Sequence, residues 1–382
     1  MTTLLLVIIY LSFISLGLPD GLLGAGWPSM YRSLNVPLSY AAIISVIISA
    51  GTIISSLMSH RLTNRFGTAK VTAFSVAATA LALVGFSLSD SFWLLCLIAI
   101  PYGLGAGSVD ASLNNYVAVH FESRHMSWLH CFWGVGATIG PSTMGIMLTN
   151  GFGWRPGFGT VGALQIMLTV LLFASLPLWD KGGSSNSSVG KSLSLKEIIS
   201  IKGVKEVLIC FFSYCALEQT AMLWGASYLS LVKGLSAEAA ASFASAFFIG
   251  LTGGRAICGF ITMKLSDRQM IRLGSAVIAL GCITMLLPLG TFAALAGLLL
   301  IGLGCAPIYP CIIHSTPFYF GSENSQAIIG VQMASAYCGT LMAPPVFGFI
   351  AENISTGLMP VFIFAFLILM AVMHEKLVNN FV

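Results

Sequence analysis

A succession of long apolar runs limits the fold of this chain more than any other feature. An apolar helix of about 20 residues crosses the hydrocarbon core of a bilayer. Charged residues make up only 8% of the chain and hydrophobic residues 57%, with a mean hydropathy of +0.93, which excludes a soluble globular domain. The sequence therefore predicts an all-α membrane protein. Its predicted spans are 4–31, 38–60, 68–88, 91–121, 126–150, 156–179, 206–232, 236–262, 268–288, 291–318, 324–350 and 355–376.

The first run and the cysteines carry no sign of secretion or metal binding. The run from Thr3 to Tyr31 is too long for a signal sequence, so we expect it to be span 1. Nine cysteines fall within apolar runs without a CxxC or Cys/His spacing, and we interpret them as packing residues rather than as disulfides or metal ligands.

One long connection divides the spans into six and six. The segment Asp180–Lys205 contains a Gly-Gly-Ser-Ser-Asn-Ser-Ser stretch, typical of a flexible linker, followed by the predicted helix Ser194–Ser200. We therefore predict an N-terminal six-helix bundle over 1–179, a cytoplasmic linker over 180–205 and a C-terminal six-helix bundle over 206–382. Two such halves are typical of a transporter built from structural repeats.

A short pattern recurs in corresponding spans of the two halves. An intramembrane acid is followed by a tryptophan about two helical turns later and then by a tyrosine that closes the span. The members are Asp20, Trp27 and Tyr31 in span 1, and Glu218, Trp224 and Tyr228 in span 7. The spacing differs by one residue, so the repeat is weak, but it agrees with a pseudo-symmetric protein.

The positions of the cations predict the orientation. With the N-terminus inside, the outer loops contain only Arg32, Arg155 and Lys233 of the 17 lysines and arginines. Cytoplasmic loops carry an excess of these residues, so both termini are expected to be cytoplasmic. Arg255 lies within span 8, where it could snorkel to the inner surface or pair with an acid.

Three acids lie well inside predicted spans. Of 13 aspartates and glutamates, these are Asp20, Asp110 and Glu218. A charged group at membrane depth costs several kcal/mol unless it is paired, protonated or in contact with water. A lone carboxyl group in an apolar cavity can load and release protons near neutral pH. The three acids are therefore candidates for one central cavity, the alternative being structural acids bound to hydroxyl or backbone groups.

The neighbours of these acids suggest the chemistry of a substrate. Asp110 and Asn114 are four residues apart and share one helical face. Amides and carboxylates hold sugar hydroxyls, and aromatic faces cover the C–H side of a sugar ring. The alternatives are interfacial tryptophans and packing histidines. The candidate substrate-binding residues are Asp20, Asn114, Asn115, Glu218, Gln219, Trp27, Trp133, Trp224, His130 and Gln332, with Tyr116, Tyr309, Tyr337, Gln165 and His314 as further cavity candidates.

Glycine and proline predict where helices bend and approach each other. The sequence Pro19-Asp20-Gly21 should break span 1, because proline removes a helical hydrogen bond and glycine loosens the turn. Glycines in spans 4 and 5 should allow close helix packing; they are Gly103, Gly105, Gly107, Gly134, Gly136, Gly140 and Gly145.

The segment His60–Lys70 resembles a signature of the major facilitator superfamily. In that family the loop between spans 2 and 3 usually reads G-x-x-x-D-R-x-G-R-R/K. Arg65, Gly67 and Lys70 match, whereas Asn64 replaces the aspartate. The resemblance implies a gating loop formed by these four residues. The departure at Asn64 implies a neutral version of the usual charged gate.

Within the superfamily, two stretches are similar to the fucose/hexose–proton symporters. Their fourth span reads E-T-A-A-N-P-F/Y-V, and here it reads Asp110-Ala-Ser-Leu-Asn114-Asn115-Tyr116-Val117. Their first span carries N-D-I-L-L, matched by Pro19-Asp20-Gly-Leu-Leu. The resemblance assigns proton coupling to Asp110 and Asp20. The spacing of Glu218 and Trp224 is similar to that in the sodium-dependent glucose transporter-like group.

These features together predict a transporter with the major facilitator fold and not an enzyme. We expect proton-coupled symport of a monosaccharide or related small polar sugar by alternating access, in a bacterial inner membrane. The expected coupling ion is H+, or alternatively Na+, with no other cofactor, no metal, no nucleic acid and a monomeric state. The alternative is a proton-coupled antiporter of a drug-like or lipophilic compound, because Gly136-xxx-Gly140-Pro141 resembles the span 5 signature of such antiporters. A membrane-bound enzyme or receptor is disfavoured by the small loops.

Overall fold

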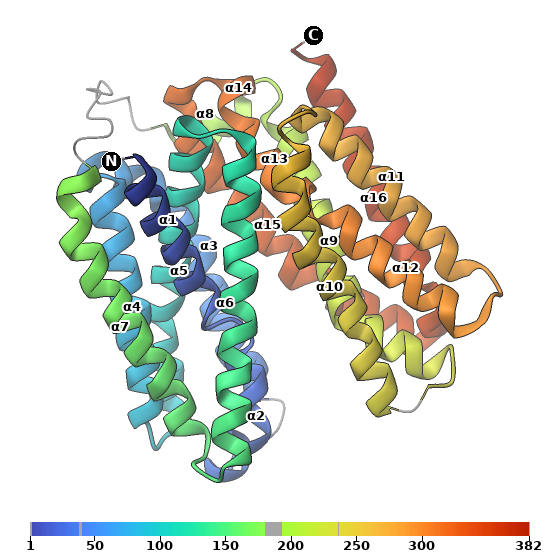
Figure 1. Cartoon of the computed structure of the whole chain (residues 1–382), viewed down its shortest axis with the longest axis horizontal. Coiled ribbons are helices and arrows are strands. Elements are labelled where there is room, and N and C mark those ends of the chain that lie inside the picture. Colours follow the sequence, from blue (N-terminus) through green and yellow to red (C-terminus); the bar gives the residue numbers. More distant parts are fainter. Residues whose placement is uncertain (1, 38–39, 180–192, 236, 382) are drawn as a thin grey trace. The chain divides into compact units, whose positions relative to one another are not determined.

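A computed structural model describes residues 2–37, 40–179, 193–235 and 237–381 of the chain. In this part of the chain the regular elements are helices (Figure 1). The predicted Gly/Ser-rich stretch of the linker lies outside the described residues. The predicted helix that follows it is confirmed as α8, Leu195–Ser200, which begins with a capping box made by Ser194 and Glu197.

The helices before the linker make up the first six predicted spans. They are α1 (Thr2–Gly17), α2 (Leu22–Ser33), α3 (Ala41–Phe66), α4 (Thr68–Leu88), α5 (Phe92–His120), α6 (Ser123–Thr149) and α7 (Trp154–Trp179). Those after it are α9 (Val204–Leu231), α10 (Ala237–Ile261), α11 (Asp267–Leu286), α12 (Gly290–Cys305), α13 (Ile308–His314), α14 (Thr316–Phe320), α15 (Ser322–Ile350) and α16 (Met359–Asn379), with a π-helix (Ala351–Ser355) and a 3-10 helix (Thr356–Leu358) before α16.

The length and composition of these helices confirm the predicted fold class. Ten stretches of the described chain are long and apolar enough to cross a membrane. One of them, Ser322–Asn379, contains both α15 and α16, and α10 carries a shorter apolar stretch, Ala246–Ile261. The chain is thus an all-α membrane protein whose twelve predicted crossings form two pseudo-symmetric six-helix bundles.

Span 1 is broken where the sequence predicts a break. Helix α1 ends at Gly17 and α2 begins at Leu22. Gly21 adopts a left-handed conformation with φ of +75°, which glycine tolerates best. Asp20 lies within this break, and its backbone N–H donates to the carbonyl of Gly17 at 2.9 Å. The break places the acid beside non-helical backbone.

The helices differ from the sequence prediction in two places. The segment His60–Phe66, predicted as part of a loop, continues α3, so that the connection to α4 is Gly67 alone, with φ of +81°. Apolarity marks only the part of a helix inside the membrane, whereas backbone hydrogen bonding continues α3 beyond it. The second difference lies inside span 10, which is confirmed as one apolar stretch, Gly290–Phe320, but is interrupted into α12, α13 and α14 around Pro307 and Ser315, because a proline has no N–H to continue the helical ladder.

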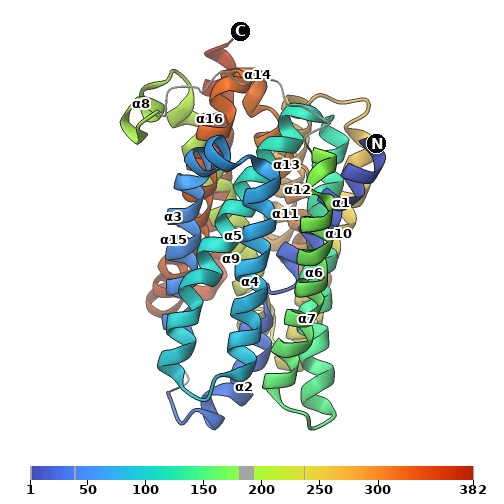
Figure 2. The same cartoon turned by 90° about the vertical axis from the view of Figure 1, so that its left-hand side faces the viewer.

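The helices cluster into two compact units. The first unit comprises Met1–Tyr116 and Leu129–Ser192, and the second comprises Val117–Trp128 and Leu193–Val382. In the first unit α4 runs beside α7, as Figures 1 and 2 both show. In the second unit α9 packs against α15 and α16, while α12 packs against α10 and α11. The end of α5 and the start of α6 therefore belong to the second unit, although they precede the linker.

Small residues let α1 press against α6 within the first unit. A Cβ atom added at Gly140 would lie 1.9 Å from the carbonyl oxygen of Leu18, and one at Gly136 would lie 2.2 Å from that of Ile14. The predicted role in helix packing is confirmed for Gly136 and Gly140, whereas for Gly145 it was wrong, because nothing lies within 4 Å of a Cβ atom there. The contact at Gly136 and Gly140 brings the end of α1, and with it Asp20, against the middle of α6.

We expect Gly140→Ala to destabilise the protein, because the new methyl group has no space beside Leu18. Overpacking of this kind typically costs about 1–3 kcal/mol. Gly145→Ala is the matched control on the same helix, since nothing lies within 4 Å of a Cβ atom there. Thermal unfolding in detergent should give a lower melting temperature for Gly140→Ala than for Gly145→Ala. Equal melting temperatures would show that the contact between α1 and α6 accommodates the added methyl group without loss of stability.

Candidate functional site

Asp20 in the first unit is held by a tryptophan. The indole Nε1 of Trp133 on α6 donates to Asp20 Oδ2 at 2.9 Å. Asp20 is exposed and Trp133 is half-buried. The structure thus brings together one predicted acid and one predicted aromatic residue through the close packing of α1 on α6.

Asp110 belongs to a buried hydrogen-bonded cluster that joins α5 to α6. Asn114 Nδ2 donates to Asp110 Oδ1 at 2.7 Å and to the backbone carbonyl of Asp110 at 3.0 Å, as their spacing on one helical face predicts. Nε2 of His130 lies 3.1 Å from Asn114 Oδ1. Because Asn114 uses its amide hydrogens on Asp110, its oxygen faces His130, and Nε2 of His130 acts as the donor. Asn114 thus couples the carboxylate to the imidazole.

The two aspartates of the first unit differ in their exposure. Asp110 is only 4% exposed, whereas Asp20 is open to its surroundings. A buried carboxylate with an imidazole two hydrogen bonds away, as at Asp110, can hold and exchange a proton.

Other predicted residues of the first unit lie in packing positions. Trp27 is 4% exposed and packs edge-on against Phe92 in the apolar core. Gln165 donates to the backbone carbonyl of Ser15 and accepts from Thr79 at 2.9 Å, which ties α7 to α1 and α4. Asn115 is half-buried one position beyond Asn114. Trp27 thus packs in the apolar core, and Gln165 joins three helices.

Glu218 in the second unit forms an ion pair with Arg255. The Arg255 Nη2 atom lies 3.3 Å from Glu218 Oε1, and the Tyr214 hydroxyl donates to the same oxygen at 2.9 Å. Tyr214 OH also lies 3.0 Å from the carbonyl oxygen of Cys305, so the pair is anchored to α12. Of the two expectations for Arg255, pairing with an acid is the one that the structure shows, and snorkelling was wrong, because the Arg255 side chain is only 4% exposed.

The remaining predicted residues of the second unit contact different helices. Trp224 donates to the backbone carbonyl of Pro344 at 3.1 Å. Gln332 is fully buried on α15 and binds Thr316 at 3.0 Å through Oε1, while its Nε2 has no hydrogen-bond partner among the described residues. Gln219 is half-buried one position beyond Glu218. These groups leave Glu218 as the centre of the polar site in this unit.

The four residues predicted as a gating loop lie where α3 meets α4. Asn64 is 3.2 Å from His60 through Nδ2 and Nε2, and the Arg65 guanidinium stacks on Phe66 at 5.3 Å from the ring centroid. Gly67 supplies the turn, and Lys70 is exposed in the first turn of α4. Asn64, which stands where the family usually has an aspartate, thus interacts with the imidazole of His60.

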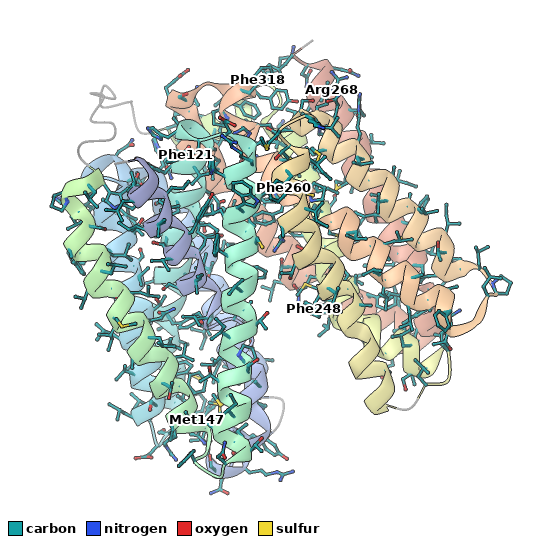
Figure 3. All side chains as sticks on the ribbon, viewed as in Figure 1. Phe121, Met147, Phe248, Phe260, Arg268 and Phe318 are labelled. Carbon is teal, nitrogen blue, oxygen red and sulfur yellow. The ribbon has the colours of Figure 1, made fainter. Side chains whose placement is uncertain are left out.

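One cluster in the second unit was not predicted. His314 Nδ1 lies 2.6 Å from Asp267 Oδ2, and His314 Nε2 lies 3.1 Å from the carbonyl oxygen of Phe121. Ser123 donates to the other oxygen of Asp267 at 2.5 Å. Figure 3 labels Phe121, near one end of the unit. These bonds attach the connection between α5 and α6 to α11 and α13. Polar residues at the ends of separate apolar runs gave no signal of this proximity.

Comparison with known proteins decides the family. The model of the Major Facilitator Superfamily matches residues 9–317, which is most of the chain. The chain belongs to the major facilitator superfamily. Among curated relatives of this transporter is the cis,cis-muconate transport protein of Acinetobacter baylyi, 23% identical over 86% of this chain and 83% of the relative.

Two sugar symporters share the fold. The transporter superposes on FucP, the fucose:proton symporter of E. coli, with a TM-score of 0.80 at 14% identity, covering 98% of both chains. It superposes on the proton:xylose symporter XylE, bound to 6-bromo-6-deoxy-D-glucose, with a TM-score of 0.80 at 12% identity, covering 97% of this chain and 94% of XylE. The expected resemblance to fucose/hexose symporters is confirmed at the level of family and fold.

Proposed function

We propose that this transporter carries a monosaccharide or a related small polar sugar together with protons, by alternating access. The observation that supports this most is the presence, inside one unit, of two carboxylates: the accessible Asp20, bound by Trp133, and the buried Asp110, bound by Asn114. The similarity in fold to two sugar:proton symporters agrees with it. In a symporter, a proton bound at such a site changes the conformational equilibrium only if it binds the two states unequally.

The proposal assigns separate roles to the polar groups. Asp110 binds the coupling proton, held in place by Asn114 and His130. Asp20 binds sugar hydroxyls or assists coupling, with the ring of Trp133 beside it. Glu218 accepts hydrogen bonds from sugar hydroxyls in the second unit, and Trp224, Gln219 and Gln332 of the same unit are assigned to the sugar as polar and aromatic groups. Together these groups provide acceptors and amide donors, which recognise hydroxyls.

A second candidate substrate is a small carboxylate. The relative from A. baylyi is named for cis,cis-muconate transport, and the second unit contains a buried arginine, a residue type that binds carboxylates well. The same unit, however, already pairs this arginine with Glu218. We therefore rank a neutral sugar above a carboxylate.

The test is a ligand screen by thermal stability of the purified protein. A ligand that binds only the folded protein raises its melting temperature with increasing concentration. We expect at least one monosaccharide of the panel to stabilise the protein, and cis,cis-muconate not to do so. Stabilisation by muconate alone would favour the carboxylate, and stabilisation by lipophilic cations alone would favour drug antiport. Repeating the sugar measurement with and without Na+ tests the coupling ion.

The proposed location is a bacterial inner membrane with both termini in the cytoplasm. Cysteine labelling in a cysteine-free background provides the measurement. An impermeant reagent should label Arg155→Cys in right-side-out vesicles and leave Lys196→Cys unlabelled, because lysines and arginines concentrate on the inner side. The opposite labelling pattern would reverse the proposed orientation.

A further inference from the structure

The ion pair of the second unit has an inner and an outer member. The Arg255 side chain is 4% exposed and that of Glu218 is 14% exposed, so the acid is the more accessible member of the pair. Arginine stays charged when buried. The Glu218 carboxylate therefore determines the net charge that a ligand encounters at this ion pair.

The two oxygens of Glu218 have different partners. Both the Tyr214 hydroxyl and Arg255 Nη2 contact Oε1. Neither of these two bonds uses Oε2. A carboxylate oxygen only accepts hydrogen bonds, so Oε2 suits a ligand hydroxyl and repels a ligand carboxylate.

We propose that Glu218 determines the charge selectivity of this transporter by neutralising Arg255 and presenting Oε2 to neutral, hydroxyl-bearing ligands. This inference rests on the proposed function only for the identity of the ligand. Without the Glu218 carboxylate, the guanidinium attracts a carboxylate from outside, and the site becomes selective for anions such as a uronate. Tyr214 orients the acid, because its hydroxyl fixes the oxygen that Arg255 also contacts.

The first experiment removes the carboxylate of Glu218 by mutation and supplies acetate in its place. Glu218→Ala leaves space beside Arg255, and we expect acetate to raise its melting temperature by several degrees more than chloride at equal ionic strength. Acetamide, the neutral isostere, should have no such effect. The wild type and Glu218→Ala/Arg255→Met should respond to acetate no more than to chloride. An equal acetate response in the double variant, or none in Glu218→Ala, would overturn the proposal.

Glu218→Gln supplies a second test that keeps the side-chain volume, since removing one member of a buried pair can prevent folding. In proteoliposomes, the uptake of glucuronate relative to glucose should rise at least about tenfold over the wild-type ratio, which equals ~1.4 kcal/mol of selectivity. An unchanged ratio would contradict the inference. If the wild type binds no sugar while acetate still rescues Glu218→Ala, the ion-pair role stands and the sugar proposal fails. If the wild type binds sugar without that rescue, only this inference fails.

Discussion

The Asp110→Asn variant is expected to lose proton-driven accumulation of sugar while keeping exchange of sugar between two loaded pools. Asparagine matches the volume of a protonated aspartate but can neither bind nor release a proton. The variant with sugar bound should therefore still change conformation. It cannot release a proton from position 110 on the other side of the membrane. A 1:1 symporter can concentrate its substrate about tenfold for each unit of pH gradient, and this gain should disappear. Radiolabelled uptake and counterflow in proteoliposomes measure the two activities.

Two further variants control this prediction. Asp90→Asn makes the same chemical change at an exposed residue, whose carboxylate contacts Arg155, and should retain accumulation. Asp20→Asn should impair both accumulation and exchange, because Asp20 is assigned to the sugar as well as to coupling. If Asp110→Asn still concentrates sugar with protons alone, Asp110 is not the coupling residue.

The Asn114→Ala variant is expected to weaken sugar binding by about ten- to a hundredfold. Asn114 is fully buried and joins Asp110 to His130, so its loss removes the hydrogen bond that it donates to the buried carboxylate of Asp110 and disturbs the polar cluster of the proposed site. Hydrogen bonds to charged groups are worth ~1.5–3 kcal/mol, which corresponds to that range of affinity. Asn150→Ala at the end of α6 is the matched control, because that exposed asparagine donates to the carbonyl of Ile146 on its own helix. Sugar affinity can be measured by equilibrium binding to the purified variants, and equal affinities would place the sugar away from this cluster.

The sequence predicts local features of the site well. The spacing of Asp110 and Asn114 on one helical face determines their hydrogen bond, and Pro19-Asp20-Gly21 indicates the break in span 1. Apolar runs identify the crossings because the bilayer requires them. In each case the cause lies within a few neighbouring residues or in the solvent, so a single sequence contains the necessary information.

Contacts between distant helices were harder to predict. The bond between His130 and Asn114, and that between Trp133 and Asp20, depend on how closely α6 approaches its neighbours. The glycines of α6 indicated that neighbouring helices can approach it closely. They did not indicate which residues of the two helices face each other. The attachment of Val117–Trp128 to the second unit depends on Asp267 and His314, which lie far along the chain. The helical extension of α3 to Phe66 was missed because hydropathy reports membrane burial and not backbone hydrogen bonding.

The most direct test of the proposed function is uptake by the wild-type protein in proteoliposomes, with the sugar that stabilises it most. An inwardly directed proton gradient, in the absence of Na+, should drive the internal sugar concentration above the external one. A protonophore should return it to equality. Equilibration to the same internal level with and without the gradient would contradict proton-coupled symport.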